Sequence, residues 1–195
     1  MFELPAHDQQ ALVSFLQDLV CIPSFSCQEK DVAERLAAEM LAVGFDDVWT
    51  DRIGNVVGRI GPGTGPRLLF NGHMDTVGVG DPEAWTHDPF SAAIVDGRLH
   101  GRGATDMKGP LTSLVYGAKA LKDSGLKLAG DLYVVGVVQE EPCEGYAMRV
   151  LVEEEGLRPD WVVLAEPTNL RVTRGHRGRM DMHVTVRGRS SHAST

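Results

Sequence analysis

The sequence predicts an α/β protein with a mixed central sheet flanked by helices, and two observations carry this prediction. Apolar runs typical of buried strands occur at 67–70, 132–138 and 161–164. Segments with apolar residues at helical spacing lie between and before these runs. Strands that alternate with helices in this way are typical of a sheet covered by helices.

The first part of the chain is predicted to hold two helices and a hairpin. In the first helix, for which Asp8 is the expected N-cap, apolar residues recur at positions 12, 15, 16, 19 and 20. A second helix is expected to start at Ser26, where Ser26 and Glu29 form a capping box, and to stop near Gly44. Strands over about 46–51 and 55–60 follow, joined by a turn at residues 54–55.

Two further helices are expected in the second part of the chain. One covers about 108–122, with Gly125 near its end, and the other covers about 144–155. From Arg179 onward the pattern changes, because Met180, Met182, Val184 and Val186 alternate with polar residues. This alternation predicts a half-buried antiparallel strand. We therefore divide the chain into a first domain, 1–178, and the start of a second domain, 179–195, that is cut off at its end.

Composition excludes several classes of function. The formal net charge of -8 leaves no basic stripe to replace phosphate counterions, which argues against nucleic acid. No apolar stretch approaches the roughly 18 residues that a membrane span needs. Three scattered cysteines argue against a disulfide framework. The N-terminus lacks the pattern of a signal peptide, so a cytoplasmic protein is expected.

Acidic residues and one histidine follow the predicted strands. They are His73 and Asp75, Asp106 in a glycine-rich loop, the pair Glu140-Glu141, and Glu166. Ligands of open α/β sheets gather beyond the carboxyl ends of the strands. An imidazole and several carboxylates at that edge are suitable ligands for a divalent cation. We expect His73, Asp106, Glu141 and Glu166 to surround a common point in a metal hydrolase site, with Asp75 in contact with His73.

Each motif also has a simpler interpretation. A single His-x-Asp is more often a core or surface histidine, and consecutive glutamates are usually a solvated pair. The loop around Gly101 and Gly103 fails the nucleotide-binding patterns, because position 106 is Asp where the dinucleotide fingerprint has Gly. His7, His87 and His100 are interpreted as structural or solvated. The joint arrangement is far less expected by chance than any of its parts.

The chain resembles the zinc-dependent deacylase and exopeptidase family that includes acetylornithine deacetylase, succinyl-diaminopimelate desuccinylase, aminoacylase and carboxypeptidase G. The motifs that carry the resemblance occur in the family's order and spacing: His73-Met74-Asp75-Thr76-Val77, Gly101-Arg102-Gly103 through Asp106-Met107-Lys108-Gly109, Gln139-Glu140-Glu141, Ala165-Glu166-Pro167-Thr168 and Ser191-His192-Ala193-Ser194. The resemblance covers essentially the whole chain. It implies a zinc exopeptidase-like catalytic domain over 1–178, with 179–195 as the first strand of an α+β lid and dimerisation domain.

The resemblance also implies roles for individual residues. Asp106 would bridge two zinc ions, for which cobalt or manganese could substitute. His73 and Glu166 would complete the protein ligands of one ion, and Glu141 would hold the other. Glu140 would be the general base and then the acid, while Asp75 would hold His73 in place. A cis peptide is implied between Asp106 and Met107.

Substrate and partner follow from the same resemblance. The expected substrate is a small-molecule amide, either an N-acyl amino acid or a small peptide, and the full-length protein would be a homodimer. His192 matches a lid histidine that reaches the partner's site, and Arg177, beside His176, could hold a substrate carboxylate. The family's late histidine ligand and its lid are missing from these residues. A non-catalytic metal- or ligand-binding fragment is therefore the alternative interpretation.

Overall fold

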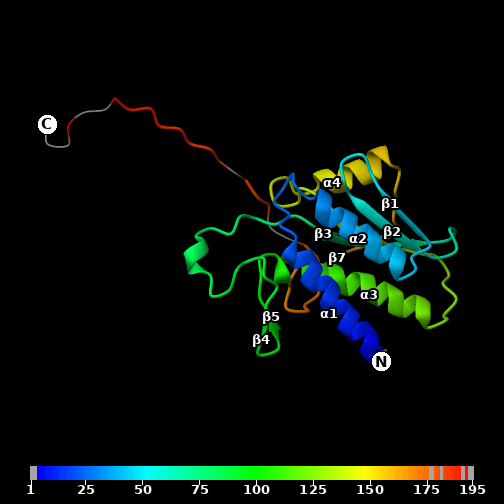
Figure 1. The fold of residues 1–195 in the computed structure, drawn as a ribbon. Helices are drawn as coiled ribbons and strands as arrows, with labels where there is room; N and C mark the ends of the chain where they lie inside the picture. The colour runs from blue at the N-terminus through cyan, green and yellow to red at the C-terminus, as the bar shows by residue number, and fades with distance from the viewer. Residues whose placement is uncertain (1–3, 176–177, 181, 190–191, 193–195) are drawn as a thin grey trace.

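The computed structural model describes residues 4–175, 178–180, 182–189 and 192. Its centre is a five-stranded mixed sheet in the order β1-β2-β6-β3-β7 (Figure 1). The strands are β1 (Asp47–Thr50), β2 (Val56–Ile60), β3 (Arg67–His73), β6 (Asp131–Val137) and β7 (Trp161–Leu164). β3 is parallel to both of its neighbours, β6 and β7, whereas β1, β2 and β6 pair antiparallel. The predicted α/β class with a mixed sheet is confirmed.

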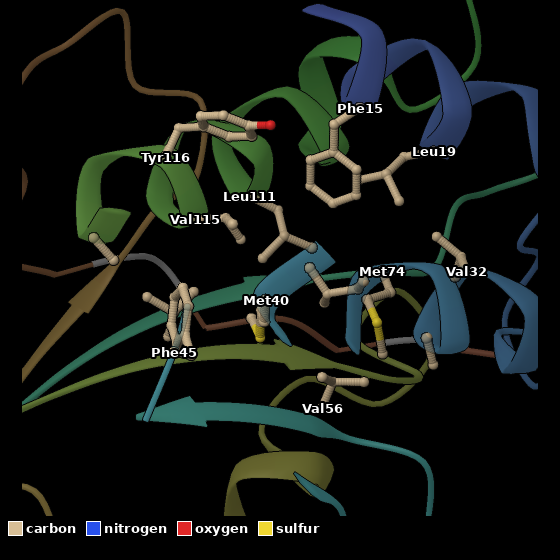
Figure 2. Close-up of a cluster of buried hydrophobic side chains, with 14 of the residues drawn as sticks. Phe15, Leu19, Val32, Met40, Phe45, Val56, Met74, Leu111, Val115 and Tyr116 are labelled. Atoms are coloured by element: carbon tan, nitrogen blue, oxygen red, sulfur yellow. The ribbon is translucent and has the colours of Figure 1, made fainter. Parts of the chain in front are cut away.

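Three long helices pack on one face of the sheet: α1 (Ala6–Cys21), α2 (Lys30–Ala42) and α3 (Gly109–Asp123). Their apolar sides meet the sheet in a continuous core. Figure 2 shows part of this core, including Phe15 from α1, Met40 from α2, Leu111 from α3 and Met74, which follows β3. Burial of these side chains is the main favourable contribution to folding on this face.

The other face of the sheet is covered by a shorter helical segment. It consists of α4 (Tyr146–Arg149) and the π-helical turn η3 (Val150–Glu154). Ala147 and Leu151 from this segment pack against Val57, Leu69 and Val135 of the sheet. The central strands are thus covered on both faces, which explains their apolar sequences.

A long connection links β3 to α3. It contains the short helix η1 (Pro82–Ala84), the two-stranded hairpin β4 (Ile94–Val95) and β5 (Arg98–Leu99), and the turn η2 (Ala104–Lys108). Among the helices in the described part of the chain, none has the length and apolar character needed to cross a membrane.

The predicted helix caps differ from the structure. α1 starts after Pro5, and Asp8 lies buried in its first turn, where it pairs with Lys119 at 2.9 Å. α2 starts after Glu29 rather than at Ser26, and no capping box forms. Both acids and Ser26 bind groups far away in the sequence, which a local pattern does not reveal.

Two predicted strands also differ. β7 forms as predicted but is not buried, because it is an edge strand whose side chains are 43% to 60% exposed. The alternating segment after Arg179 forms no strand in its described residues, 180 and 182–189, and its apolar side chains are exposed. This segment runs away from the body of the molecule (Figure 1), so no strand lies beside it to supply hydrogen bonds. The division at 178 remains a prediction.

Candidate metal centre

His73 is the last residue of β3 and is only 1% exposed. Its Nδ1 donates to the main-chain oxygen of Asp75 at 2.8 Å, and its Nε2 lies 2.9 Å from Oδ1 of Asp106. Burial lowers the pKa of the imidazole, but the nearby carboxylates of Asp75 and Asp106 outweigh burial and raise the pKa of His73 to about 9. The Nδ1 bond leaves Nε2 as the nitrogen that faces the site.

Asp75 is fully buried and connects β3 to the glutamate pair. Its carboxylate accepts hydrogen bonds from the backbone N–H groups of Glu140 at 3.0 Å and Glu141 at 3.2 Å, and from the Ser26 hydroxyl at 2.7 Å. Its Oδ1 also lies 3.5 Å from Nδ1 of His73. Burial raises the pKa of Asp75, but these donors and His73 outweigh burial and lower it. Asp75 therefore orients the imidazole and the Glu140-Glu141 loop together.

Asp106 lies in the turn η2, between β5 and α3. The peptide bond between Asp106 and Met107 is cis, as the resemblance implies. The turn is anchored by Lys108, a fully buried residue whose Nζ donates to the main-chain oxygens of Leu19 and Ile22, each at 2.8 Å. The anchor ties the turn to the C-terminal end of α1, while the Asp106 carboxylate stays exposed to the site.

The three glutamates follow the two strands that flank β3. Glu140 and Glu141 come just after β6, and Glu166 comes just after β7. Burial raises the pKa of Glu140 to about 7, and the charges of Glu166, Glu141 and Asp75 add to the effect while His73 opposes it. Partial burial and neighbouring carboxylates likewise raise the pKa of Glu141 and of Glu166. Carboxylates in such proximity repel one another, which a cation would relieve.

His73, Asp106 and Glu166 form the group best arranged for a metal ion among the described residues. One ligand atom from each lies within 4.8 Å of the others. One imidazole nitrogen and two carboxylate oxygens are a suitable ligand set for zinc, which leaves a fourth position open. Glu141 lies outside this group, although its charge raises the pKa of Glu166. The residues present thus fit one divalent cation directly.

Of the two predicted substrate-binding residues, Arg177 and His192, the structure describes His192. Arg177 and its neighbour His176 lie outside the described residues. His192 is exposed in the C-terminal segment. His87 and His100 pack against each other with ring centroids 4.7 Å apart, and His7 is exposed near Asp8.

Three residues that support the site were not predicted from the sequence pattern. Ser26 binds Asp75, Glu29 accepts the backbone N–H of Gln139 at 2.9 Å, and Lys108 anchors the Asp106 turn. Ser26 and Glu29 were interpreted as a helix cap because their spacing fits one. The signal that could have identified Lys108 is a lone lysine directly before an apolar helix.

The comparisons with known proteins indicate the family of the chain. The family model described as peptidase family M20/M25/M40 matches residues 69–191. A protein called YgeY from Escherichia coli strain K12 is 46% identical over 191 residues, which are 97% of this chain and 47% of the relative. A probable succinyl-diaminopimelate desuccinylase from Staphylococcus epidermidis is 34% identical over 190 residues, 95% of this chain and 46% of that protein. The chain spans about half the length of these relatives.

Solved structures show the same architecture. An M20 family metallo-carboxypeptidase from Sulfolobus solfataricus superimposes with a TM-score of 0.65 at 23% identity, over 83% of this chain and 37% of that structure. Human carnosine dipeptidase 1 gives a TM-score of 0.64 at 25% identity, over 81% of this chain and 38% of that structure. The fold is therefore that of a metallopeptidase catalytic domain. The chain belongs to peptidase family M20/M25/M40.

Proposed function

We propose that the protein is a metal-dependent hydrolase that cleaves an amide bond of an N-acyl amino acid or a small peptide. The observation that carries the proposal is the group of His73, Asp106 and Glu166 beside a glutamate pair, in a chain of this family. The names of the relatives support the substrate class, since they include a desuccinylase and a dipeptidase. Zinc is the proposed metal, and cobalt or manganese could replace it.

His73, Asp106 and Glu166 would hold one ion, and Asp106 with Glu141 would hold a second. Bound cations supply Lewis acidity, which polarises the scissile carbonyl and makes water acidic enough to attack at neutral pH. His73 suits its role because the Asp75 carbonyl fixes its tautomer. Asp75 suits a supporting role because its carboxylate is occupied by the backbone of the glutamate pair.

Glu140 would act as the general base and then as the general acid. It would take the proton of the attacking water and deliver it to the nitrogen of the leaving amine. Burial supports this role, because a carboxyl group with a pKa of about 7 can both accept and release a proton near neutral pH. His192 and Arg177 are proposed to contact the substrate.

The remaining features are proposed from the same resemblance. The full-length protein would be a cytoplasmic homodimer, with residues 1–178 in the catalytic domain and 179–195 opening a lid and dimerisation domain. The second candidate function is a non-catalytic metal-binding module. It is favoured by one observation, which is that Glu141 belongs to no group of three possible metal ligands among the described residues.

Metal analysis and turnover separate the two candidates. The full-length protein and the 195-residue chain would each be dialysed against zinc, analysed for bound metal and assayed on N-acyl amino acids and dipeptides. We expect two zinc ions and hydrolysis in the full-length protein, and one ion with little hydrolysis in the shorter chain. Metal binding without hydrolysis of any such amide by the full-length protein would favour the binding module.

A further inference from the structure

The segment between α1 and α2 lies along the end of β3. Phe25 forms a single parallel bridge with Thr76. The hydroxyl of Ser24 donates to the main-chain oxygen of Met74 at 2.8 Å, and the N–H of Thr76 donates to the main-chain oxygen of Ser24 at 2.8 Å. The segment is therefore fixed to the strand that ends in His73.

Glu29 extends this attachment to the loop after β6. It is 5% exposed, and its Oε1 accepts the N–H of Cys27 and the N–H of Gln139, each at 2.9 Å. Cys27 and Gln139 both have a left-handed backbone, with φ of 69° and 55°. Residues other than glycine rarely adopt this conformation, so it needs support from the surroundings. The Glu29 carboxylate binds the N–H group of both.

Three consecutive backbone N–H groups of the loop are thus held by two buried carboxylates. Gln139 donates to Glu29, whereas Glu140 and Glu141 donate to Asp75. The Glu29 bond is made at the residue just before the proposed base. Because the backbone is hydrogen-bonded at all three positions, the points from which the Glu140 and Glu141 side chains extend are fixed.

We propose that Glu29 is a positioning residue that fixes the backbone of Gln139 and so aims Glu140 and Glu141 at the metal centre. The hydrogen bonds given for the Glu29 side chain among the described residues go to the backbone of Cys27 and Gln139, so Glu29 would act through the loop. The inference rests on the proposed roles of the glutamate pair. Loss of the carboxylate would leave the two N–H groups without their acceptor and let the Gln139 backbone relax.

The test uses three variants of the full-length protein. Glu29→Ala removes the acceptor, whereas Glu29→Gln keeps an oxygen at the same position. Glu34→Ala is the matched control, because Glu34 lies on α2, the helix that starts directly after Glu29, has a side chain that is 68% exposed and pairs only with Lys30 at 3.7 Å among the described residues. Measurements are kcat and KM per folded molecule, zinc content, and hydrogen exchange of peptides covering 138–142.

We expect Glu29→Ala to lower kcat by about 10- to 100-fold with KM nearly unchanged, because a misplacement of about 1 Å costs on this scale. Exchange over 138–142 should become faster, while the zinc ion on His73, Asp106 and Glu166 stays bound. Glu29→Gln should stay within about threefold of the parent, because its amide oxygen still accepts both hydrogen bonds. Glu34→Ala should behave as the parent.

A purely structural role would lower the thermal midpoint but leave kcat and exchange over 138–142 unchanged in the folded molecules. That result, or equal losses in Glu29→Ala and Glu34→Ala, would overturn the inference. If Glu29→Ala does not fold, Glu29→Asp replaces it, since the shorter carboxylate cannot reach both N–H groups and should give the same pattern. If the parent protein hydrolyses no amide, the proposed function fails, while the exchange comparison still tests Glu29.

Discussion

β6 and β7 flank β3 on opposite sides and have similar apolar sequences, yet their environments differ. Every residue of β6 is buried, whereas every residue of β7 is exposed. β6 lies between two strands and under helices on both faces, while β7 pairs only with β3 in the part of the chain that the structure describes. An apolar run therefore predicts a strand, but its burial depends on what lies beside it.

The same contrast holds for the carboxylates that follow the two strands. After β6, Glu140 and Glu141 are half-buried on a backbone held by Asp75 and Glu29. After β7, Glu166 is an exposed residue, and the nearest described backbone tie is from Ala165 N–H to the Asn71 oxygen at 2.9 Å. The loop after β6 thus has more hydrogen bonds to its backbone than the residue after β7. This suits the proposed role of Glu140, because a proton-transfer residue has to lie within hydrogen-bond reach of the proton that it moves.

The largest effect on kcat should come from substituting the acidic residues that follow β6 and β7. Glu140→Gln in the full-length protein should lower kcat by about two to four orders of magnitude and keep the zinc content, because it removes the base but no ligand. Glu166→Gln and Glu141→Gln should instead lower zinc content, because each removes the charge of a proposed ligand. Loss of zinc in Glu140→Gln with full zinc in Glu141→Gln would reverse the roles of the pair.

A second prediction concerns His73, at the end of the strand between β6 and β7. Its pKa of about 9 in the metal-free protein means that the imidazole is protonated at neutral pH, and a metal ion has to displace that proton. Zinc affinity should therefore rise with pH, by about tenfold per unit well below the pKa and by about 50-fold between pH 7 and 9, and level off above the pKa. Competition titrations against a chelator would measure this, and an affinity independent of pH over that range would contradict it.

The burial contrast predicts unequal costs for the same substitution. Val135→Ala in β6 should lower the free energy of unfolding by about 2 kcal/mol, because it leaves a cavity in a packed core. Val162→Ala in β7 should cost less than about 0.5 kcal/mol, because the side chain already contacts solvent. Denaturant titration of the 195-residue chain would compare them. Equal costs would mean that β7 is covered in solution.

The smallest effect is expected at Ser26, whose hydroxyl donates to Asp75. Ser26→Ala should lower kcat by about three- to tenfold, because Asp75 keeps its two backbone donors and loses only one hydrogen bond. Ser91→Ala is the control, since the Ser91 hydroxyl donates to the main-chain oxygen of Asp88 in an exposed turn. A decrease in kcat for Ser26→Ala as large as that for Glu140→Gln would contradict this, because it would show that Asp75 needs the Ser26 hydroxyl to keep its position.

Much of the fold was predictable from local pattern. The helices and the five strands of the main sheet lie within a few residues of their predicted positions, because apolar periodicity and glycine positions are local properties. The predicted caps at Asp8 and Ser26 were wrong, because each side chain found a distant partner. The strand predicted over 180–186 was wrong for its described residues, because no neighbouring strand supplies its hydrogen bonds.

The sequence by itself determined the α/β class, the family and the identity of the candidate ligands, because these depend on residue type and spacing. Only the tertiary structure decided how those residues meet. It brought His73, Asp106 and Glu166 together from three segments, assigned Asp75 to the backbone of the glutamate pair, and placed Glu29 against Gln139. These contacts join residues up to 110 positions apart. A sequence pattern does not give the spatial distance between such residues. That distance is set by the packing of β3 between β6 and β7.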